Sequence, residues 1–275
     1  MIPVVGGSSP LGHPTHLGNP PRKWQPPEID CGAAPSAACQ LVVDAALAQM
    51  IANVPGAIDG RDPEYLHQLR VGIRRLRTVF LVFQATALGR RLRKLARPLG
   101  EARDWDVFVA RFGRGKAERM AARRRCRRAL ESAEFRAFIV DARRFRGKTG
   151  AASVVAFAAK ALDHLHRRTL KRARDVDWRN EGRRHRVRIA VRRLRYACDF
   201  FSPCFDDSRR YLRGLADLQD LLGNLNDIAV ARRLGGAKLE KMERALLSEL
   251  VPAWRAFEKR PRFWADTGRP RAAAR

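Results

Sequence analysis

One pattern occurs twice in this chain, and it constrains the fold more than any other feature. In both copies a His is followed by the order x-apolar-Arg-apolar-x-apolar-Arg-Arg-Leu-Arg. The copies run from His67 to Arg77 and from His185 to Arg195, and they read HQLRVGIRRLR and HRVRIAVRRLR. Wound as a helix, the pattern places positive charge on one side and apolar residues on the other. We therefore expect two matching amphipathic helices in an internally duplicated chain.

Four residues of each copy fall on one side of its predicted helix, within an arc of about 80° at about 100° per residue. They are His67, Arg70, Arg74 and Arg77 in the first copy and His185, Arg188, Arg192 and Arg195 in the second. Aligned arginines repel one another, at a cost of roughly a few tenths of a kcal/mol per pair. A solvated face paired with Asp or Glu is the ordinary explanation of one such stripe. Two stripes in register favour an anion-binding site instead.

The apolar side of the first copy is expected to form a core face, and only Arg75 points well away from the stripe. That core face consists of Leu66, Leu69, Ile73, Leu76, Phe80 and Phe83, with Val187, Val191 and Leu194 at the matching side of the second copy. Further basic residues near each copy are expected to extend the charged surface. They are Arg90, Arg93, Lys94 and Arg97 in the first half and Arg209, Arg210 and Arg213 in the second, with Arg232 and Arg233 as additional candidates.

The charge balance indicates a polyanionic partner. The 275 residues carry a formal net charge of +28, and the excess lies after residue 36, because the few charges before it cancel. Hydrophobic residues make up 45% of the chain, which is enough for a real core and excludes a disordered basic tail. Such a field attracts polyanions and weakens as salt is added. The candidate partners are nucleic acid, an anionic membrane and an inorganic phosphate polymer.

The cysteines and the apolar residues suggest an intracellular protein. The five cysteines are odd in number and show no Cys-x-x-Cys spacing, so we expect neither a disulfide framework nor a thiolate zinc site, and a reducing cytoplasm fits. No run of about 20 apolar residues is apparent, so no membrane span is expected. The N-terminus MIPVVGGSSPLGHP lacks the charged region and apolar core of a secretory signal.

The alternation of apolar runs and helix breakers predicts helices throughout and no strands. Residues 1–35, rich in Gly, Pro and Ser, are interpreted as a mobile tail, and residues 259–275 as a basic C-terminal tail. Asp62 and Pro63 signal a helix start, because Asp caps the first turn and Pro fits the first helical position. The expected helices cover 36–54, 63–85, 88–97 (ended by Pro98), 99–112, two within 116–146, 151–175, 181–202, 207–234 and 237–258.

A second internal echo supports a duplication. The segment LGEARDWDV (residues 99–107) resembles LGNLNDIAV (residues 222–230), and each follows its His-Arg helix by a similar interval. Two halves with the same order of elements predict two related helical bundles, at about 36–146 and about 151–258.

The chain resembles the CHAD domains (conserved histidine α-helical domains) over roughly residues 36–258. The resemblance rests on the segments HQLRVGIRRLR, LGEARDWDV, RRHRVRIAVRRLRY and LQDLLGNLND. It implies an all-α fold of two four-helix bundles related by pseudo-twofold symmetry. It also implies a basic central cavity that binds inorganic polyphosphate, with the eight stripe residues as binding positions, and association with polyphosphate granules. Family members are often fused to a triphosphate-processing CYTH domain, whose Glu-x-Glu-x-Lys signature is not found here, so the chain resembles the stand-alone form.

Other motifs give weaker support for chemistry. Asp104, Asp106 and Asp227 could suggest metal-assisted phosphate chemistry, but two Asp at i,i+2 do not face each other on a helix, and a structural role in ion pairs or hydrogen bonds is favoured. His164 and His166 are splayed apart for the same reason. We therefore expect no catalytic residue, metal or cofactor.

The leading hypothesis is a non-enzymatic, cytoplasmic module that binds inorganic polyphosphate. The alternative is weak binding to the RNA or DNA backbone; nucleic-acid binders interleave aromatic residues with basic ones, and the stripes carry none. A phosphatase or polyphosphate kinase is the third hypothesis, and nothing in the sequence supplies a nucleophile or a nucleotide loop. The oligomeric state is left open.

Overall fold

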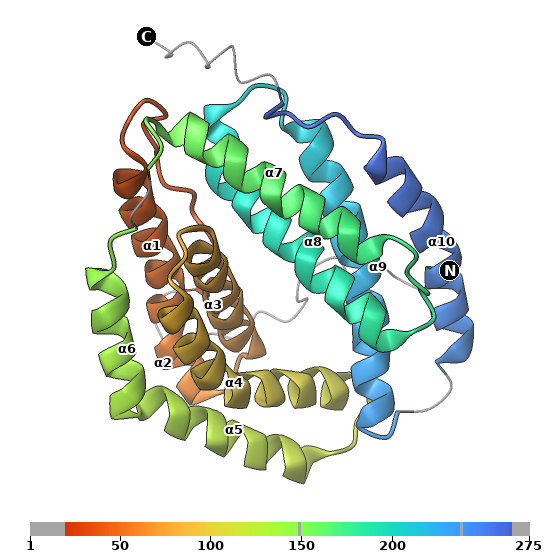
Figure 1. Ribbon diagram of the computed structural model, residues 1–275. Coiled ribbons are helices and arrows are strands. Elements are labelled where there is room, and N and C mark those ends of the chain that lie inside the picture. The colour runs from red at the N-terminus through yellow and green to blue at the C-terminus, as the bar shows by residue number, and fades with distance from the viewer. Residues whose placement is uncertain (1–19, 148–149, 237–238, 266–275) are drawn as a thin grey trace.

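The computed structural model describes residues 20–147, 150–236 and 239–265 (Figure 1). Within these ranges the chain is helical and contains no strand, which confirms the predicted all-α class. The first six helices are α1 (Pro35–Ala52), α2 (Val54–Asp59), α3 (Pro63–Val82), α4 (Thr86–Phe112), α5 (Lys116–Glu131) and α6 (Ala133–Arg144). The others are α7 (Val154–Ala173), α8 (Glu181–Phe201), the short 3₁₀ helix η1 (Ser202–Cys204), α9 (Arg209–Arg233) and α10 (Glu240–Glu258).

The two helices that carry the repeats begin where the sequence predicts. The side chain of Asp62 accepts a hydrogen bond from the backbone N–H of Glu64, 2.8 Å away, and caps α3. Asn180 caps α8 in the same way through the N–H of Arg183, at 2.9 Å. These caps satisfy backbone donors that a helix start leaves without intrahelical partners.

Helix α4 corrects the prediction of two helices separated by Pro98. The structure has one continuous helix with Pro98 inside it. Leu92, Leu95 and Leu99 are buried on one face through the Pro, so packing of that face outweighs the hydrogen bond that the Pro removes. Figure 1 shows α4 changing direction part way along its length, as a helix with an internal Pro usually does.

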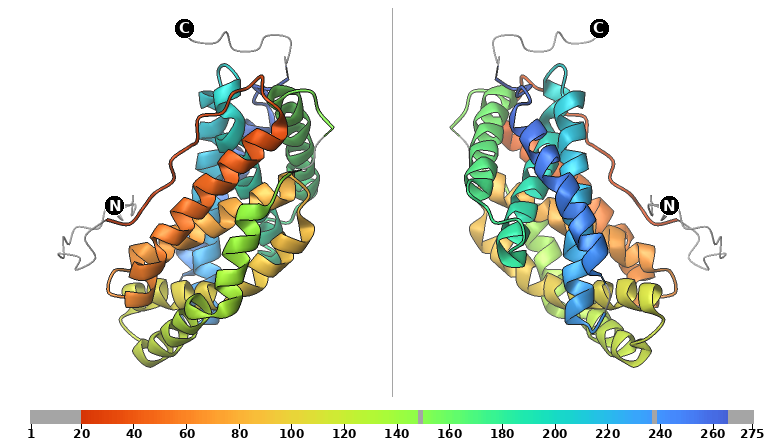
Figure 2. Two further views of the ribbon diagram at one scale, coloured as in Figure 1. Left: turned by 90° about the vertical axis from the view of Figure 1, so that its left-hand side faces the viewer. Right: turned by 90° about the vertical axis from the view of Figure 1, so that its right-hand side faces the viewer.

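The helices pack in two sets around the repeat helices. Helix α3 contacts α1, α2 and α4, whereas α8 contacts α7 and α9, and α10 lies on α9. The two sets meet mainly where α3 touches α8. Figure 2 shows α1 and α6 on one side of the molecule and α7 and α10 on the opposite side. The two charged helices thus occupy the middle of the fold.

The predicted core faces of both repeat helices are buried. The side chains expected to form them, on α3 and on α8, are each at most 3% exposed. Burying one such Leu, Ile or Phe side chain contributes about 1.5–3 kcal/mol. The core therefore fixes which side of each repeat helix faces away from it, and the arginine stripes occupy that side.

The N-terminal segment corrects part of the predicted mobile tail. Residues 20–34 pack against the helices: the ring of Trp24 lies 5.8 Å from that of Phe200, and Asn53 exchanges hydrogen bonds with the backbone of Arg22. Residues 1–19 of the predicted tail, and most of the predicted C-terminal tail, lie outside the described residues.

This segment also accounts for Arg75, the one arginine of the first repeat that leaves the stripe. Its guanidinium carbon lies 4.4 Å from the ring centre of Trp24 and 4.6 Å from that of Tyr196. It also forms an ion pair of 3.0 Å with Asp199. Two cation–π contacts and a carboxylate thus engage Arg75 within the protein.

A disulfide between Cys31 and Cys204 corrects the expectation of reduced cysteines. Their Cα atoms are 5.4 Å apart although the residues are 173 positions apart in sequence, so no local spacing could reveal the pair. The bond ties the N-terminal segment to η1. Cys39, Cys126 and Cys198 are free and buried. Because disulfides persist mainly in oxidising compartments, the cysteines no longer support a reducing cytoplasm.

The stretch Pro35–Asp59 corrects the expectation that no segment is long and apolar enough to span a membrane. Its most apolar window has a mean hydropathy of 1.5, and by length and composition alone it is a candidate membrane span. Half of that window is buried within the fold, where α1 packs against α3. The core helix of a folded domain passes the same test of length and composition, and α1 packs against α3 in this fold.

Candidate anion-binding cavity

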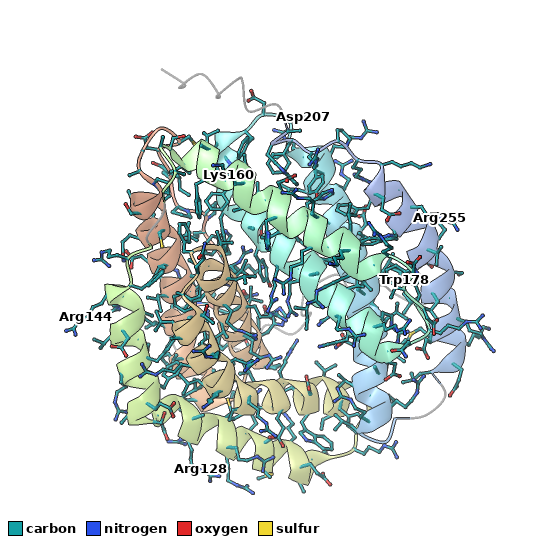
Figure 3. All side chains as sticks on the ribbon, in the orientation of Figure 1. Arg128, Arg144, Lys160, Trp178, Asp207 and Arg255 are labelled. Atoms are coloured by element: carbon teal, nitrogen blue, oxygen red, sulfur yellow. A yellow bond between two sulfur atoms is a disulfide. The ribbon has the colours of Figure 1, made fainter. Side chains whose placement is uncertain are left out.

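A cavity of about 430 Å³ lies between α3, α4, α8 and α9. Figure 3 shows nitrogen-bearing side chains projecting into the space between these helices. Nine of the fifteen residues that the sequence proposed for binding line it. They are His67, Arg70, Arg74, Arg77, Arg93, Arg97, His185, Arg188 and Arg192. Both repeat helices therefore contribute their stripes to one cavity.

Arg195, the last residue of the second stripe, does not line the cavity. It lies near Asp199, one helical turn further along α8, and near Arg75. Arg77, at the same place in the first copy, does line the cavity. At about 80° from the His, this position stands at the edge of the stripe, so small differences in packing decide which way it faces.

The remaining proposed residues also lie outside the cavity. Arg90 and Lys94, near the start of α4, are exposed and are not among the residues that line the cavity. Arg209, Arg210 and Arg213 are exposed near the start of α9, whereas the cavity-lining residues of α9 lie between Asn226 and Arg233. Only one part of each long helix therefore reaches the cavity, and proximity in sequence overestimated the extent of the charged surface.

Sequence reasoning missed several residues that line the cavity. Arg103 and Arg111 of α4 are two of them, and they follow Arg93 and Arg97 on the same side of the helix. Dividing α4 at Pro98 hid this continuation. Arg233, named only as an additional candidate, also lines the cavity, as do Asn226, Asp104 and Asp227.

The echoed Leu-Gly motif makes room for one of the stripe arginines. A Cβ added at Gly100 would lie 2.8 Å from Nη1 of Arg70, which is closer than such atoms approach. The Gly therefore lets the guanidinium of Arg70 lie directly against α4. No such contact exists at Gly223, the matching position in α9, because nothing lies within 4 Å of a Cβ there.

The cavity carries a large excess of positive charge. Ten arginines and two aspartates line it, which gives a formal charge of +8 when both histidines are neutral. Among the described residues no carboxylate lies within ion-pair distance of Arg70, Arg74, Arg188 or Arg192. The buried Nε atoms of Arg74 and Arg188 also have no hydrogen-bond partner in the described part of the chain. Unsatisfied buried donors of this kind are costly unless a ligand accepts from them.

Burial and mutual repulsion act on these arginines. Burial and, next, the charge of neighbouring Arg74 together lower the pKa of Arg70 to about 10. Burial, followed by Arg74 and Arg188, lowers the pKa of Arg192 well below its ordinary value. These guanidiniums are thus destabilised in their charged form, and an anion between them would relieve both effects.

The two repeat histidines contribute hydrogen-bonding groups rather than charge. Burial, and then the positive charge of Arg103, Arg74 and Arg70, lowers the pKa of His67 to about 4. Burial also lowers the pKa of His185, whose Nδ1 donates to Oδ1 of Asn226 at 2.9 Å. His67 is therefore neutral at neutral pH.

The three aspartates of the echoed motif have different roles. Asp106 has a side chain that is 2% exposed, and it binds Arg119 at 2.8 Å and Arg123 at 2.5 Å on α5. It fulfils the structural role that the sequence favoured. Asp104 and Asp227 instead line the cavity, where burial raises the pKa of Asp104 and nearby Arg70 opposes that change.

The histidines of α7 are separate from this cavity. His166 is buried, and its Nδ1 lies 2.8 Å from the hydroxyl of Tyr211. His164 lines a different, more apolar pocket near the end of α3. In the described ranges no group of three or more His, Cys, Asp and Glu side chains is placed to hold a metal ion.

Comparisons with known proteins identify the family of this chain. The family model of the CHAD domain matches residues 41–235. The crystal structure of the CHAD domain from the plant Ricinus communis is similar to this chain, with 30% sequence identity and a TM-score of 0.70. The similarity covers 91% of this chain and 95% of that chain. No curated protein matches the sequence. The chain belongs to the CHAD domain family.

Proposed function

We propose that this protein binds inorganic polyphosphate in the central cavity without chemically converting it. The observation that carries the proposal is the convergence of both arginine stripes on one cavity with a large positive excess. Planar guanidiniums bind phosphate oxygens through paired N–H donors. A phosphate polymer presents one negative charge per unit along a flexible chain, so it can contact guanidiniums from both repeat helices at once.

The aromatic residues of the cavity favour this ligand over single-stranded nucleic acid. Phe108 and Phe112 line the cavity, but their rings pack on each other, with centres 4.8 Å apart. Phe108 is 3% exposed and also contacts Trp105 edge to face. Stacking of bases needs an accessible aromatic face. RNA or DNA binding through the backbone alone remains the second candidate function.

We also infer that the fold arose by duplication of a helical bundle, giving two four-helix bundles related by pseudo-twofold symmetry. The contacts of α3 with α1 and α4 correspond to those of α8 with α7 and α9. The matched positions Asp104 and Asp227 of the echoed motif both line the cavity. This correspondence explains why each half supplies one His and a set of arginines.

Association with polyphosphate granules in the cytoplasm is part of the proposal, and its support is the family resemblance. The Cys31–Cys204 disulfide favours an oxidising compartment instead. The chemistry of the cavity supports a phosphate polymer as ligand in either compartment.

A competition assay tests the proposed ligand. Labelled long-chain polyphosphate is bound to the protein and displaced with unlabelled polyphosphate or with single-stranded RNA of equal total charge, at moderate salt. Polyphosphate is expected to compete at least about tenfold better, a difference of about 1.4 kcal/mol, because the cavity offers many guanidiniums and its two phenylalanine rings pack on each other. Equal or better competition by RNA would overturn the ranking of the two candidate functions.

A further inference from the structure

A second arginine-lined groove, separate from the central cavity, lies between α7 and α8. Its volume is about 150 Å³. Four arginines line it: Arg168 and Arg172 from α7, and Arg186 and Arg193 from α8. No acidic residue is among its lining residues, and in the described part of the chain none of the four arginines forms an ion pair. The groove therefore has a formal charge of +4.

The first repeat shows that these arginines are not required by the fold. At the position of Arg186 the first repeat has Gln68, which is buried and bonded to Gln49 of α1 at 3.0 Å. At the position of Arg193 it has Arg75, which pairs with Asp199 inside the protein. The side chains at these two positions thus have partners within the protein in the first repeat, whereas in the second repeat they form no ion pair with a described residue.

The spacing between the paired helices also differs: α1 and α3 lie close together at Gly72, whereas a groove separates α7 from α8. Gly72 lets α3 approach α1 closely, because a Cβ there would lie 3.0 Å from the backbone N of Met50. The matching residue of α8 is Ala190, which lines the groove. In the second repeat, the larger residue Ala190 lies at an open groove between α7 and α8. In the first repeat, the matching helices α1 and α3 pack closely at Gly72.

The groove is electrostatically continuous with the central cavity. Arg77 lines the cavity and Arg193 lines the groove. Burial lowers the pKa of Arg193, and the charges of Arg77, Arg168 and Arg172 also lower it, so Arg193 is within electrostatic reach of a cavity arginine and of the other groove arginines. A row of positive charge therefore leads from the cavity, past Arg77, to the outer surface of α7.

We propose that the groove between α7 and α8 is a second binding site for the same phosphate polymer, which leaves the central cavity past Arg77 and continues along Arg193, Arg186, Arg168 and Arg172. The proposal rests on the proposed function of the cavity. A short polymer fills the cavity alone, whereas a long one contacts both sites. The groove thus makes the protein selective for long chains, since the second contact is intramolecular once the first has formed.

The test compares a groove variant with a variant of matched charge. The groove variant is Arg168→Ala, Arg172→Ala and Arg186→Ala, three exposed residues whose loss leaves the core intact. The matched variant is Arg124→Ala, Arg128→Ala and Arg144→Ala, three exposed residues of α5 and α6. Figure 3 shows Arg128 and Arg144 at the outer edge of the molecule, away from both sites.

Calorimetric titrations with tripolyphosphate and with long-chain polyphosphate give the result. In the groove variant the affinity for the long chain is expected to fall about tenfold or more. The slope of the logarithm of affinity against the logarithm of salt concentration is expected to become shallower by about two to three, because three arginines no longer contact phosphates. Its affinity for tripolyphosphate is expected to stay within about twofold of the wild type. The matched variant is expected to retain both affinities, because its arginines touch neither site.

Each of the other possible results would overturn either the second site or the proposed function. An unchanged long-chain affinity in the groove variant would overturn the second site. An equal loss for both polymers, or a similar loss in the matched variant, would also overturn it, since the effect would then come from overall charge. Failure of the wild-type protein to bind either polymer would instead refute the proposed function itself. Far-ultraviolet circular dichroism of all variants verifies that helicity is retained.

Discussion

The double variant Arg74→Ala with Arg192→Ala is expected to bind polyphosphate at least about 100-fold more weakly than the wild type, a loss of about 2.7 kcal/mol. Both residues line the cavity, one from each repeat, and neither has a carboxylate partner among the described residues. A hydrogen bond to a charged group contributes about 1.5–3 kcal/mol, so two lost arginines account for this magnitude. Fluorescence anisotropy with labelled polymer measures it.

The same variant is expected to unfold at the same temperature as the wild type or above it. Arg74 and Arg192 repel each other in the free protein, and removing both relieves that repulsion. The matched control is Arg90→Ala with Lys94→Ala, which removes the same charge from exposed positions of α4 outside the cavity. Equal losses of affinity in the two double variants would contradict a specific cavity site.

The second large effect concerns stability. Asp106→Ala is expected to lower the free energy of unfolding by about 3 kcal/mol, because breaking a buried ion pair leaves its partner charges uncompensated. Asp106 binds both Arg119 and Arg123, and the side chain of Arg123 is only 13% exposed. These ion pairs attach α5 to α4. Chemical denaturation followed by circular dichroism measures the loss.

Asp104→Ala is the matched control for this prediction. Asp104 lies two residues away on the same helix, but it lines the cavity and forms no ion pair with a described residue. Its removal is expected to change stability little and to tighten polyphosphate binding severalfold, because a negative charge leaves the site. If Asp104→Ala destabilised the protein as much as Asp106→Ala, the division of roles between the two aspartates would be wrong.

Much of the fold could be predicted because its signals are local. The helical period placed Leu69 and Ile73 on a core face and Arg70 and Arg74 on the stripe beside it; the first two are buried and the two arginines line the cavity. The cap at Asp62 marked the start of α3 for the same reason. Seven of the eight stripe residues line one cavity, since a helix with one buried face must direct the other face elsewhere.

The rest depended on contacts between segments far apart in sequence. Arg195 lies near Asp199 and does not line the cavity, and nothing in the repeat itself distinguishes it from Arg77. The disulfide of Cys31 joins residues that only the folded chain brings together. Pro98 gave a correct signal for a disturbed helix, but burial of both flanks kept α4 continuous and placed Arg103 and Arg111 in the cavity.

The most direct measurement is a crystal structure of the protein with tripolyphosphate bound. The account predicts phosphate oxygens in the central cavity, within hydrogen-bond distance of guanidiniums from both repeats, with Arg74 and Arg188 each donating through the Nε atom that now lacks a partner. Phosphate groups bound only at exposed arginines, with the cavity containing none, would contradict it.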